Sequence, residues 1–260
     1  MSVPGVRIPP PPPNRNDQPW RTAVGHFSTI RMKTFARQVL DFTQSLHPDL
    51  PLPPGFELLF PYTKPETLRV MTQFYERFYQ DMQPRIFIFG INPGRFGAGV
   101  TGVPFTDPIR LETECGIAND FAKKPELSSD FVYRFVHAYG GTEAFYSRFY
   151  ITSLSPLGFV QNGINCNYYD DKRLQAAVEP FIIKSITTQM QFGTTPRVAL
   201  CMGQGKNAAY FQKINAIHKF FERILVLPHP RWVMQYRRKR LPEFLQLYVN
   251  TLRTAAVFEH

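Results

Sequence analysis

Short apolar runs alternate with amphipathic stretches over most of the chain. Four runs have the length and composition of buried strands, and they lie at 86–89, 149–152, 198–201 and 224–227. Apolar residues recur at helical spacing between them, over 172–190 and 205–217. Strands that alternate with helices are typical of a parallel sheet covered on both faces. The pattern therefore predicts an α/β fold, a three-layer αβα sandwich around a four-stranded, mostly parallel sheet.

Two further helices are expected before the first strand. The first runs from Phe35 to Leu46 and is ended by Pro48, because proline cannot continue a helix. The second carries Met71 and Phe78 on one face. A proline-rich crossing separates the two helices.

The N-terminal residues 1–25 differ in composition from the rest. They are rich in Pro, Arg and Asn and include five consecutive prolines, so we expect a flexible arm. Residues 26–260 are enough for one α/β domain and too few for two. A last helix over roughly 241–253 is expected to close this domain.

Targeting signals and cysteine usage restrict the class of protein. No apolar run is long enough to span a bilayer, and the N-terminus lacks the apolar core of a signal peptide. Cys115, Cys166 and Cys201 are scattered singly, which excludes a disulfide framework and a four-cysteine cluster. We therefore expect a cytoplasmic protein that uses no metal and no cofactor.

The charge balance is basic. Lys and Arg outnumber Asp and Glu by 30 to 20, which gives a net charge of +10 and a pI near 9.6. This excess suits a polyanionic partner, although a basic soluble protein without such a partner fits it equally well. The charge is unevenly spread along the chain, and Arg237–Arg240 form one dense basic block.

The segments that follow the four strands are the expected location of the chemistry. In open parallel sheets, ligands bind outside the carboxyl ends of the strands. The four segments should therefore converge, and they are Gly90–Gly94, Ser153–Pro156, Gly203–Lys206 and His229–Trp232.

The glycine-rich segment Gly97–Gly102 spells G-x-G-x-x-G, but its context excludes dinucleotide binding. Seven residues separate it from the preceding strand, and Pro104 follows almost at once. A Walker loop fails as well, because Val103 and Pro104 stand where Lys and Ser/Thr are required. The flexible turn can instead place the Phe105 ring over a pocket. Alternatively, this ring is simply part of the hydrophobic core.

Two segments have compositions that are suited to binding nucleic acid. Trp232 and Tyr236 are interleaved with Arg231 and the basic block, an arrangement that can stack on bases while contacting phosphates. A solvated basic helix start explains these residues equally well. The Gly203–Lys206 turn enters a helix and can offer backbone amides to a phosphate, or it is only a tight turn.

The segment from Gly90 to Phe105 resembles the uracil-DNA glycosylase superfamily, and most closely its single-strand-selective monofunctional branch. The match runs in order over sixteen positions, as G-x-N-P-G-x-F-G followed by T-G-V-P-F. His229-Pro230 is similar to the opening of the second motif of the superfamily. Weaker similarity extends from about residue 35 to residue 250 and includes the Gly203 turn.

The resemblance implies roles for individual residues. Asn92 would position the attacking water, and His229 would bond the pyrimidine O2 as negative charge develops there. Phe105 would stack on the flipped base, and the backbone around Ile91 and Gly94 would line the pocket near C5 of the base.

Two departures from the family pattern bear on specificity. Ser153 stands where the family usually has an Asn that reads the Watson–Crick edge, and a hydroxyl cannot reproduce the paired donor and acceptor of an amide. The second motif usually runs H-P-S-P, whereas this chain has Arg231 and Trp232 after Pro230. Arg231, Trp232 or Tyr236 would then fill the gap left by the flipped base, a pattern that resembles a bacterial second subgroup of the branch.

The resemblance implies a monomeric, monofunctional base-excision-repair enzyme that removes uracil, and other deaminated or oxidised bases, from single- and double-stranded DNA. Two alternatives remain open: a non-enzymatic nucleic-acid-binding module on the same fold, and a nucleotide hydrolase of another class. The residues expected to contact DNA outside the base pocket are Arg231, Trp232, Tyr236, Arg237, Arg238, Lys239, Gly203, Gln204 and Lys206.

Overall fold

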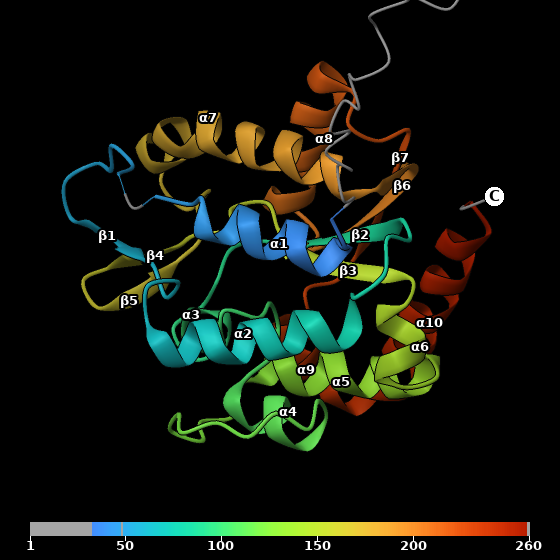
Figure 1. Cartoon of the computed structure of the whole chain (residues 1–260). Coiled ribbons are helices and arrows are strands. Elements are labelled where there is room, and N and C mark those ends of the chain that lie inside the picture. The colour runs from blue at the N-terminus through green and yellow to red at the C-terminus, as the bar shows by residue number, and fades with distance from the viewer. Residues whose placement is uncertain (1–32, 48, 259–260) are drawn as a thin grey trace, which may run out of the picture. The chain divides into compact units, whose positions relative to one another are not determined.

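The structure is a computed structural model that describes residues 33–47 and 49–258 (Figure 1). The arm predicted for residues 1–25 lies outside the described residues, and so does Pro48, which was expected to end the first helix. That helix, α1, spans Phe35–Gln44 and ends two residues before Leu46.

The four predicted strands form one parallel sheet. They are β2 (Arg85–Gly90), β3 (Phe149–Ser153), β6 (Thr194–Met202) and β7 (Arg223–Leu227), in the order β3-β2-β6-β7. All three pairings are parallel, so the predicted α/β fold with a four-stranded sheet is confirmed. β6 begins four residues before the predicted run, and its pairing with β2 is irregular between Arg85 and Phe87.

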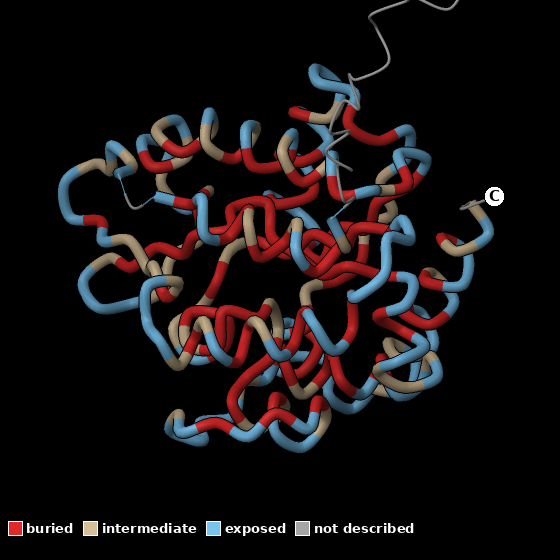
Figure 2. Tube along the Cα trace, viewed as in Figure 1, coloured by how far each residue is buried: buried red, intermediate tan, exposed pale blue. Residues whose placement is uncertain are grey.

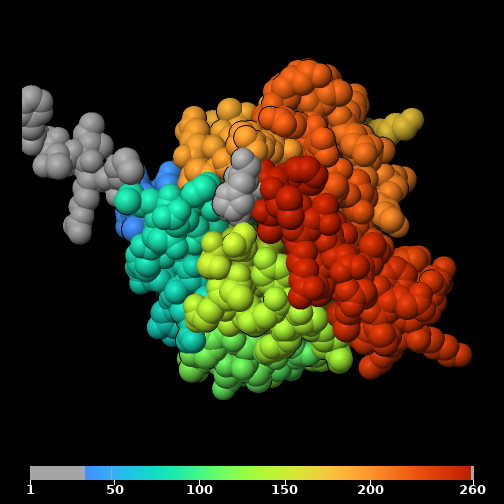
Figure 3. Space-filling model, turned by 90° about the vertical axis from the view of Figure 1, so that its right-hand side faces the viewer, coloured from blue at the N-terminus to red at the C-terminus, as the bar shows by residue number. Residues whose placement is uncertain are grey.

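Helices cover both faces of the sheet. One layer contains α1, α7 (Lys172–Gln189) and α8 (Lys206–His218); the other contains α5 (Leu127–Tyr139), α9 (Pro230–Tyr236) and α10 (Leu241–Val257) (Figure 1). α2 (Pro65–Phe78) packs on α1. The buried positions follow the sheet and the inward sides of these helices (Figure 2). Figure 3 shows α10 lying beside α5 and α6 (Thr142–Tyr146).

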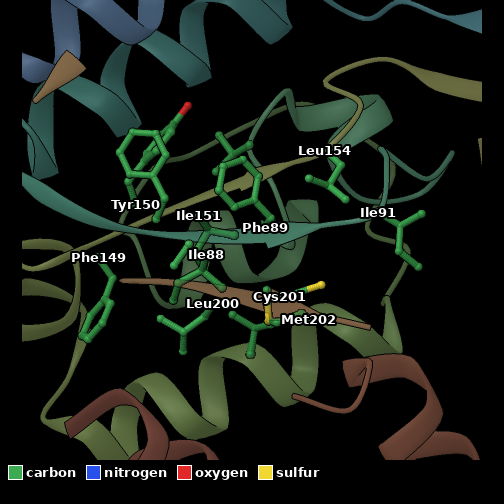
Figure 4. Close-up of a cluster of buried hydrophobic side chains, with 14 of the residues drawn as sticks. Ile88, Phe89, Ile91, Phe149, Tyr150, Ile151, Leu154, Leu200, Cys201 and Met202 are labelled. Atoms are coloured by element: carbon green, nitrogen blue, oxygen red, sulfur yellow. The ribbon is translucent and has the colours of Figure 1, made fainter. Parts of the chain in front are cut away.

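The residues of the central strand β2 show that both faces of the sheet are buried. All six of its residues are buried, and their side chains alternate between the two helical layers. In Figure 4, Phe89 and Tyr150 point to one side of the sheet, while Phe149 and Leu200 point to the other. The Phe89 ring meets Phe211 of α8 at a centroid distance of 4.9 Å.

Several elements were not expected from the sequence. A second, antiparallel sheet joins β1 (Phe56–Leu59), β4 (Gly158–Gln161) and β5 (Ile164–Cys166) in the order β1-β4-β5. α5 was also missed, although Phe131, Val132, Phe135 and Val136 give it a buried helical face. The remaining short helices are α3 (Ala98–Thr101), α4 (Pro108–Thr113) and the 3-10 turns Met190–Phe192 and Arg238–Arg240.

In the part of the chain that the structure describes, no helix combines the length and the apolar character needed to cross a membrane.

The contribution of the Phe87 side chain to the stability of this core can be measured. Its ring is fully buried and meets Tyr150 at a centroid distance of 5.0 Å. Phe87→Ala should lower the free energy of unfolding by about 3–5 kcal/mol, because it removes buried surface and leaves a cavity. Chemical denaturation measures this change. Ile217→Ala, on an exposed position of α8, is the control and should change it by less than about 0.5 kcal/mol; equal effects of the two substitutions would contradict the packing described.

Candidate active site

A cavity of about 350 Å³ lies at the carboxyl ends of the strands of the parallel sheet. The direct pairing of Gly90 with Ser153 places the ends of β2 and β3 side by side at this edge. The residues predicted from the sequence that line the cavity are Ile91, Asn92, Gly94, Phe105, Ser153, His229, Arg231, Trp232 and Tyr236. The structure therefore brings together the predicted catalytic pair, the predicted base-binding residues and part of the predicted DNA surface.

The Asn92 side chain is oriented by backbone groups of Cys166, which ends β5, and of Tyr168, which follows it. Its Oδ1 accepts the Tyr168 N–H at 3.1 Å, and its Nδ2 donates to the Cys166 carbonyl at 3.2 Å. Tyr168 is in turn anchored in the core, where its hydroxyl donates to Asn207 Oδ1 of α8 at 2.8 Å. An amide oxygen has two lone pairs, so Oδ1 keeps one for a ligand in the cavity.

His229 is the N-cap residue of α9, and this position fixes its tautomer. Its Nδ1 accepts the Arg231 N–H at 3.2 Å, so the proton of a neutral ring must reside on Nε2. Burial, followed by the positive charge of Arg231, lowers the pKa of His229 to about 4. The imidazole is therefore neutral near pH 7 and carries a single N–H donor, on Nε2.

The Phe105 ring lies beside His229, with 5.9 Å between the two ring centroids and 47° between the ring planes. Phe105 has a φ of +53°, in the left-handed region that residues with side chains seldom occupy. The ring also lies against the end of β2: a Cβ on Gly90 would come within 2.6 Å of Phe105 Cε2. Glycine at position 90 is therefore required for the ring to reach the cavity.

Ser153 ends β3 and lines the cavity beside Gly90. Past the strand ends the ladder continues, since Leu154 N–H donates to the Gly90 carbonyl and Ser155 N–H to the Ile91 carbonyl, both at 3.1 Å. The backbone on both sides of the predicted base-reading position is thus held by the sheet.

Helix α9 and the basic residues that follow it lie at the edge of the cavity. Trp232 is 37% exposed and Tyr236 is 59% exposed. The Arg237 guanidinium lies 4.7 Å from the centroid of the Trp232 ring, so an aromatic ring and a cation are presented together. Arg237, Arg238 and Lys239 are exposed and lie outside the cavity lining.

The Gly203–Lys206 turn does not line this cavity. The Gly203 N–H donates to the Leu227 carbonyl at 2.9 Å, so the sheet already uses this amide. Gln204 and Lys206 are exposed. Contact of this turn with a phosphate stays a prediction.

Reasoning from strand ends missed several residues of the cavity. They come from the start of α5 and the residue before it, from β5 and the segment after it, and from α9, and they include Glu126, Ser128, Asn165, Cys166, Asn167, Tyr169 and Gln235. The run of Asn165, Asn167 and two tyrosines is a polar cluster that could have indicated a site. It was overlooked because it follows no strand of the parallel sheet.

Nothing in residues 33–47 and 49–258 forms a group of three or more His, Cys, Asp or Glu that could hold a metal ion. The polar groups that line the cavity are side-chain amides, hydroxyls, one thiol, one imidazole, one guanidinium, one indole N–H and one carboxyl. This set suits hydrogen bonding to a polar planar ligand.

Residues 76–253 match the family model of the uracil DNA glycosylase superfamily. The chain belongs to this superfamily.

A solved structure extends this match. Over 86% of this chain and 99% of the other, the fold is similar to that of SMUG2 from Pedobacter heparinus, with a TM-score of 0.84 and 44% sequence identity. The comparison with curated proteins gave no match. The resemblance to a bacterial second subgroup of the single-strand-selective branch is thereby confirmed.

The protonation state of His229 can be measured directly. We expect the ring to remain neutral above about pH 5, because its pKa is held near 4, with the proton on Nε2. Long-range ¹H–¹⁵N NMR correlations, assigned with a His229→Gln variant, report both the tautomer and the titration. A midpoint near 6.5, or a proton on Nδ1, would show that the described surroundings of His229 are wrong.

Proposed function

We propose that the chain is a monofunctional uracil-DNA glycosylase of base excision repair, which hydrolyses the N-glycosidic bond of uracil in single- and double-stranded DNA and leaves an abasic site. One observation carries the proposal: Asn92 and His229 line the same cavity, and backbone hydrogen bonds orient both side chains. The family membership supports the reaction class.

The base must leave the helical stack to reach this cavity. A base inside a duplex cannot be contacted on all sides, so the nucleotide is flipped out at a cost of a few kcal/mol, which is smallest in single strands and mismatched pairs. Phe105 offers a ring on which the flipped base stacks, and Ser153 faces its polar edge. The exposed rings of Trp232 and Tyr236 can occupy the space that the base vacates.

His229 carries the larger share of the chemistry. As the glycosidic bond lengthens, the sugar gains oxocarbenium character and the departing uracil becomes an anion. The Nε2–H of His229 can donate to O2 of this anion. One preorganised donor at a developing oxyanion is typically worth about 3–4 kcal/mol. Because the ring is neutral beforehand, no proton has to be taken up.

Asn92 acts on the nucleophile. Its Oδ1 can accept a hydrogen bond from a water molecule and hold it against the sugar carbon, but an amide cannot remove the proton of that water at neutral pH. The fixed amide therefore contributes orientation. No lysine is among the described residues that line the cavity, which supports hydrolysis without a Schiff base and without strand cleavage.

The substrate range is proposed to extend beyond uracil to other deaminated or oxidised bases. The single hydroxyl of Ser153 constrains the base edge less than an amide would, because a hydroxyl has one donor and rotates freely. DNA is proposed to run across α9 and the basic block that follows it, with phosphates near Arg237, Arg238 and Lys239.

The reaction is tested with a labelled single-stranded oligonucleotide that contains one uracil. We expect the protein to produce strand breaks only after alkali treatment, because a monofunctional enzyme leaves an intact backbone at the abasic site. Asn92→Ala and His229→Ala should fold and lose excision activity by roughly 10²–10³-fold, the cost of removing one oriented group. The same assay on hydroxymethyluracil, hypoxanthine and xanthine defines the substrate range.

Three other outcomes would decide against the proposal. Binding of the oligonucleotide without base release indicates a nucleic-acid-binding module. Breaks without alkali indicate a lyase activity. Wild-type rates in both variants would remove Asn92 and His229 from the mechanism.

Gly90→Ala tests the placement of Phe105. The new methyl group would overlap the Phe105 ring, so the ring must move out of its stacking position. We expect excision to fall by roughly tenfold to hundredfold, because small displacements of positioning groups cost this much. Thermal unfolding should show that the variant is folded. Unchanged excision by the folded variant would mean that the ring does not stack on the base.

A further inference from the structure

Glu126 places a carboxyl group in the cavity that the mechanism above does not use. The residue immediately precedes α5, and its backbone N–H donates to Asp107 Oδ2 at 2.9 Å. The carboxyl group lies against the loop that follows β2 and contains Asn92, here called the catalytic loop (residues 91–97). A Cβ on Gly97 would lie 2.0 Å from Oε2, and a Cβ on Gly94 would lie 3.6 Å from Oε1. Glycine at position 97 therefore makes room for this carboxyl group.

The Glu126 side chain has unused hydrogen-bonding capacity. Among the described residues, none forms a hydrogen bond or ion pair with its carboxyl oxygens. Two charged groups act on it, Asp107 at the start of α4 and Arg231 at the start of α9. The other titratable groups that line the cavity are His229, Cys166, Tyr169 and Tyr236. Burial, followed by the negative charge of Asp107, raises the pKa of Glu126 to about 7, and Arg231 opposes this shift.

Asn165 supplies a donor beside this carboxyl group. Its Oδ1 accepts the Arg95 N–H at 3.2 Å, and the residue lines the cavity. Nδ2 would lie 3.4 Å from a Cβ on Gly94, the same point that Glu126 Oε1 approaches. A carboxyl group and an amide N–H₂ thus lie together at Gly94, on the catalytic loop.

We propose that Glu126 in its protonated form and Asn165 bind the flipped base together, as a second polar contact that selects bases bearing carbonyl oxygens. This proposal rests on the proposed function, since it assigns residues to the same base pocket. A carboxylic acid and an amide N–H₂ both donate hydrogen bonds to carbonyl oxygens. They provide the donors that the single hydroxyl of Ser153 cannot.

Ionised Glu126 would act against binding. A carboxylate has no donor, and its negative charge repels both the carbonyl oxygens of the base and the anion that forms on bond cleavage. Affinity for a uracil-containing strand should therefore fall as the pH rises through the range in which Glu126 loses its proton. His229 does not titrate in this range, because its pKa is about 4.

Binding is measured separately from cleavage with a single-stranded oligonucleotide that contains 2′-fluorinated deoxyuridine, whose glycosidic bond resists hydrolysis. Fluorescence anisotropy gives the Kd between pH 6 and pH 8. The reference is an oligonucleotide of the same sequence with a stable abasic-site analogue in place of the uracil nucleotide, so that the ratio of the two Kd values reports contacts to the base. For the wild type we expect the preference for uracil to weaken by about tenfold across this range, in proportion to the protonated fraction of Glu126.

Two variants distinguish the roles. Glu126→Gln keeps a neutral donor, so it should bind uracil as tightly at pH 8 as at pH 6. Asn165→Ala should weaken the uracil preference by roughly fivefold to tenfold at every pH, because one hydrogen bond to the base is lost. Glu222→Gln is the control, since Glu222 is exposed just before β7, outside the cavity lining, and its substitution removes one carboxylate, as Glu126→Gln does at pH 8. It should keep the wild-type pH profile.

The outcomes separate this proposal from the proposed function. A Glu126→Gln profile identical to that of the wild type, or an unchanged uracil preference in Asn165→Ala, overturns the role of these residues even if the protein excises uracil. Conversely, a pH-dependent uracil preference that Glu126→Gln abolishes supports the second contact, while failure to release the base from a cleavable strand counts against the glycosylase reaction alone.

Discussion

Parallel pairing of β2 with β3 and β6 is the constraint on which the site depends. Because all four strands run in the same direction, their carboxyl ends meet at one edge, and Asn92, Ser153 and His229 all line the same cavity there. The strong burial of β2 keeps this edge in place, since slipping the register by one residue would turn its phenylalanines toward the wrong helical layer. The chemistry is therefore supported by the best-packed part of the molecule.

Backbone groups, rather than other side chains, orient the reactive residues. Asn92 is held by Cys166 and Tyr168 of a hairpin segment that is itself tied to α8 through Asn207. His229 is held by the first turn of α9, and the Tyr248 hydroxyl bonds the carbonyl of Pro228 just before it. Preorganised groups of this kind need little rearrangement when charge develops, which is the main electrostatic advantage of an enzyme over water.

The sequence predicted the parts of the molecule that depend on local pattern. The four apolar runs identified the sheet, and the ends of those runs located the segments that contain Asn92, Ser153 and His229. The resemblance to the uracil-DNA glycosylase superfamily then assigned roles to these three residues. Glu126 and Asn165 could not be found in this way. They enter the cavity from a loop and from an antiparallel hairpin, and their proximity at Gly94 arises only from tertiary packing. α5 was missed for a different reason. Its apolar residues do recur at helical spacing, so the sequence contains the pattern that predicts this helix.

The most direct test of the account is a crystal structure of the Asn92→Ala protein with a uracil-containing single strand. The account predicts an intact nucleotide in the cavity, with uracil stacked on Phe105 and its O2 within hydrogen-bond distance of His229 Nε2. A strand bound along α9 with the uracil outside the cavity, or a uracil whose O2 points away from His229, would contradict it.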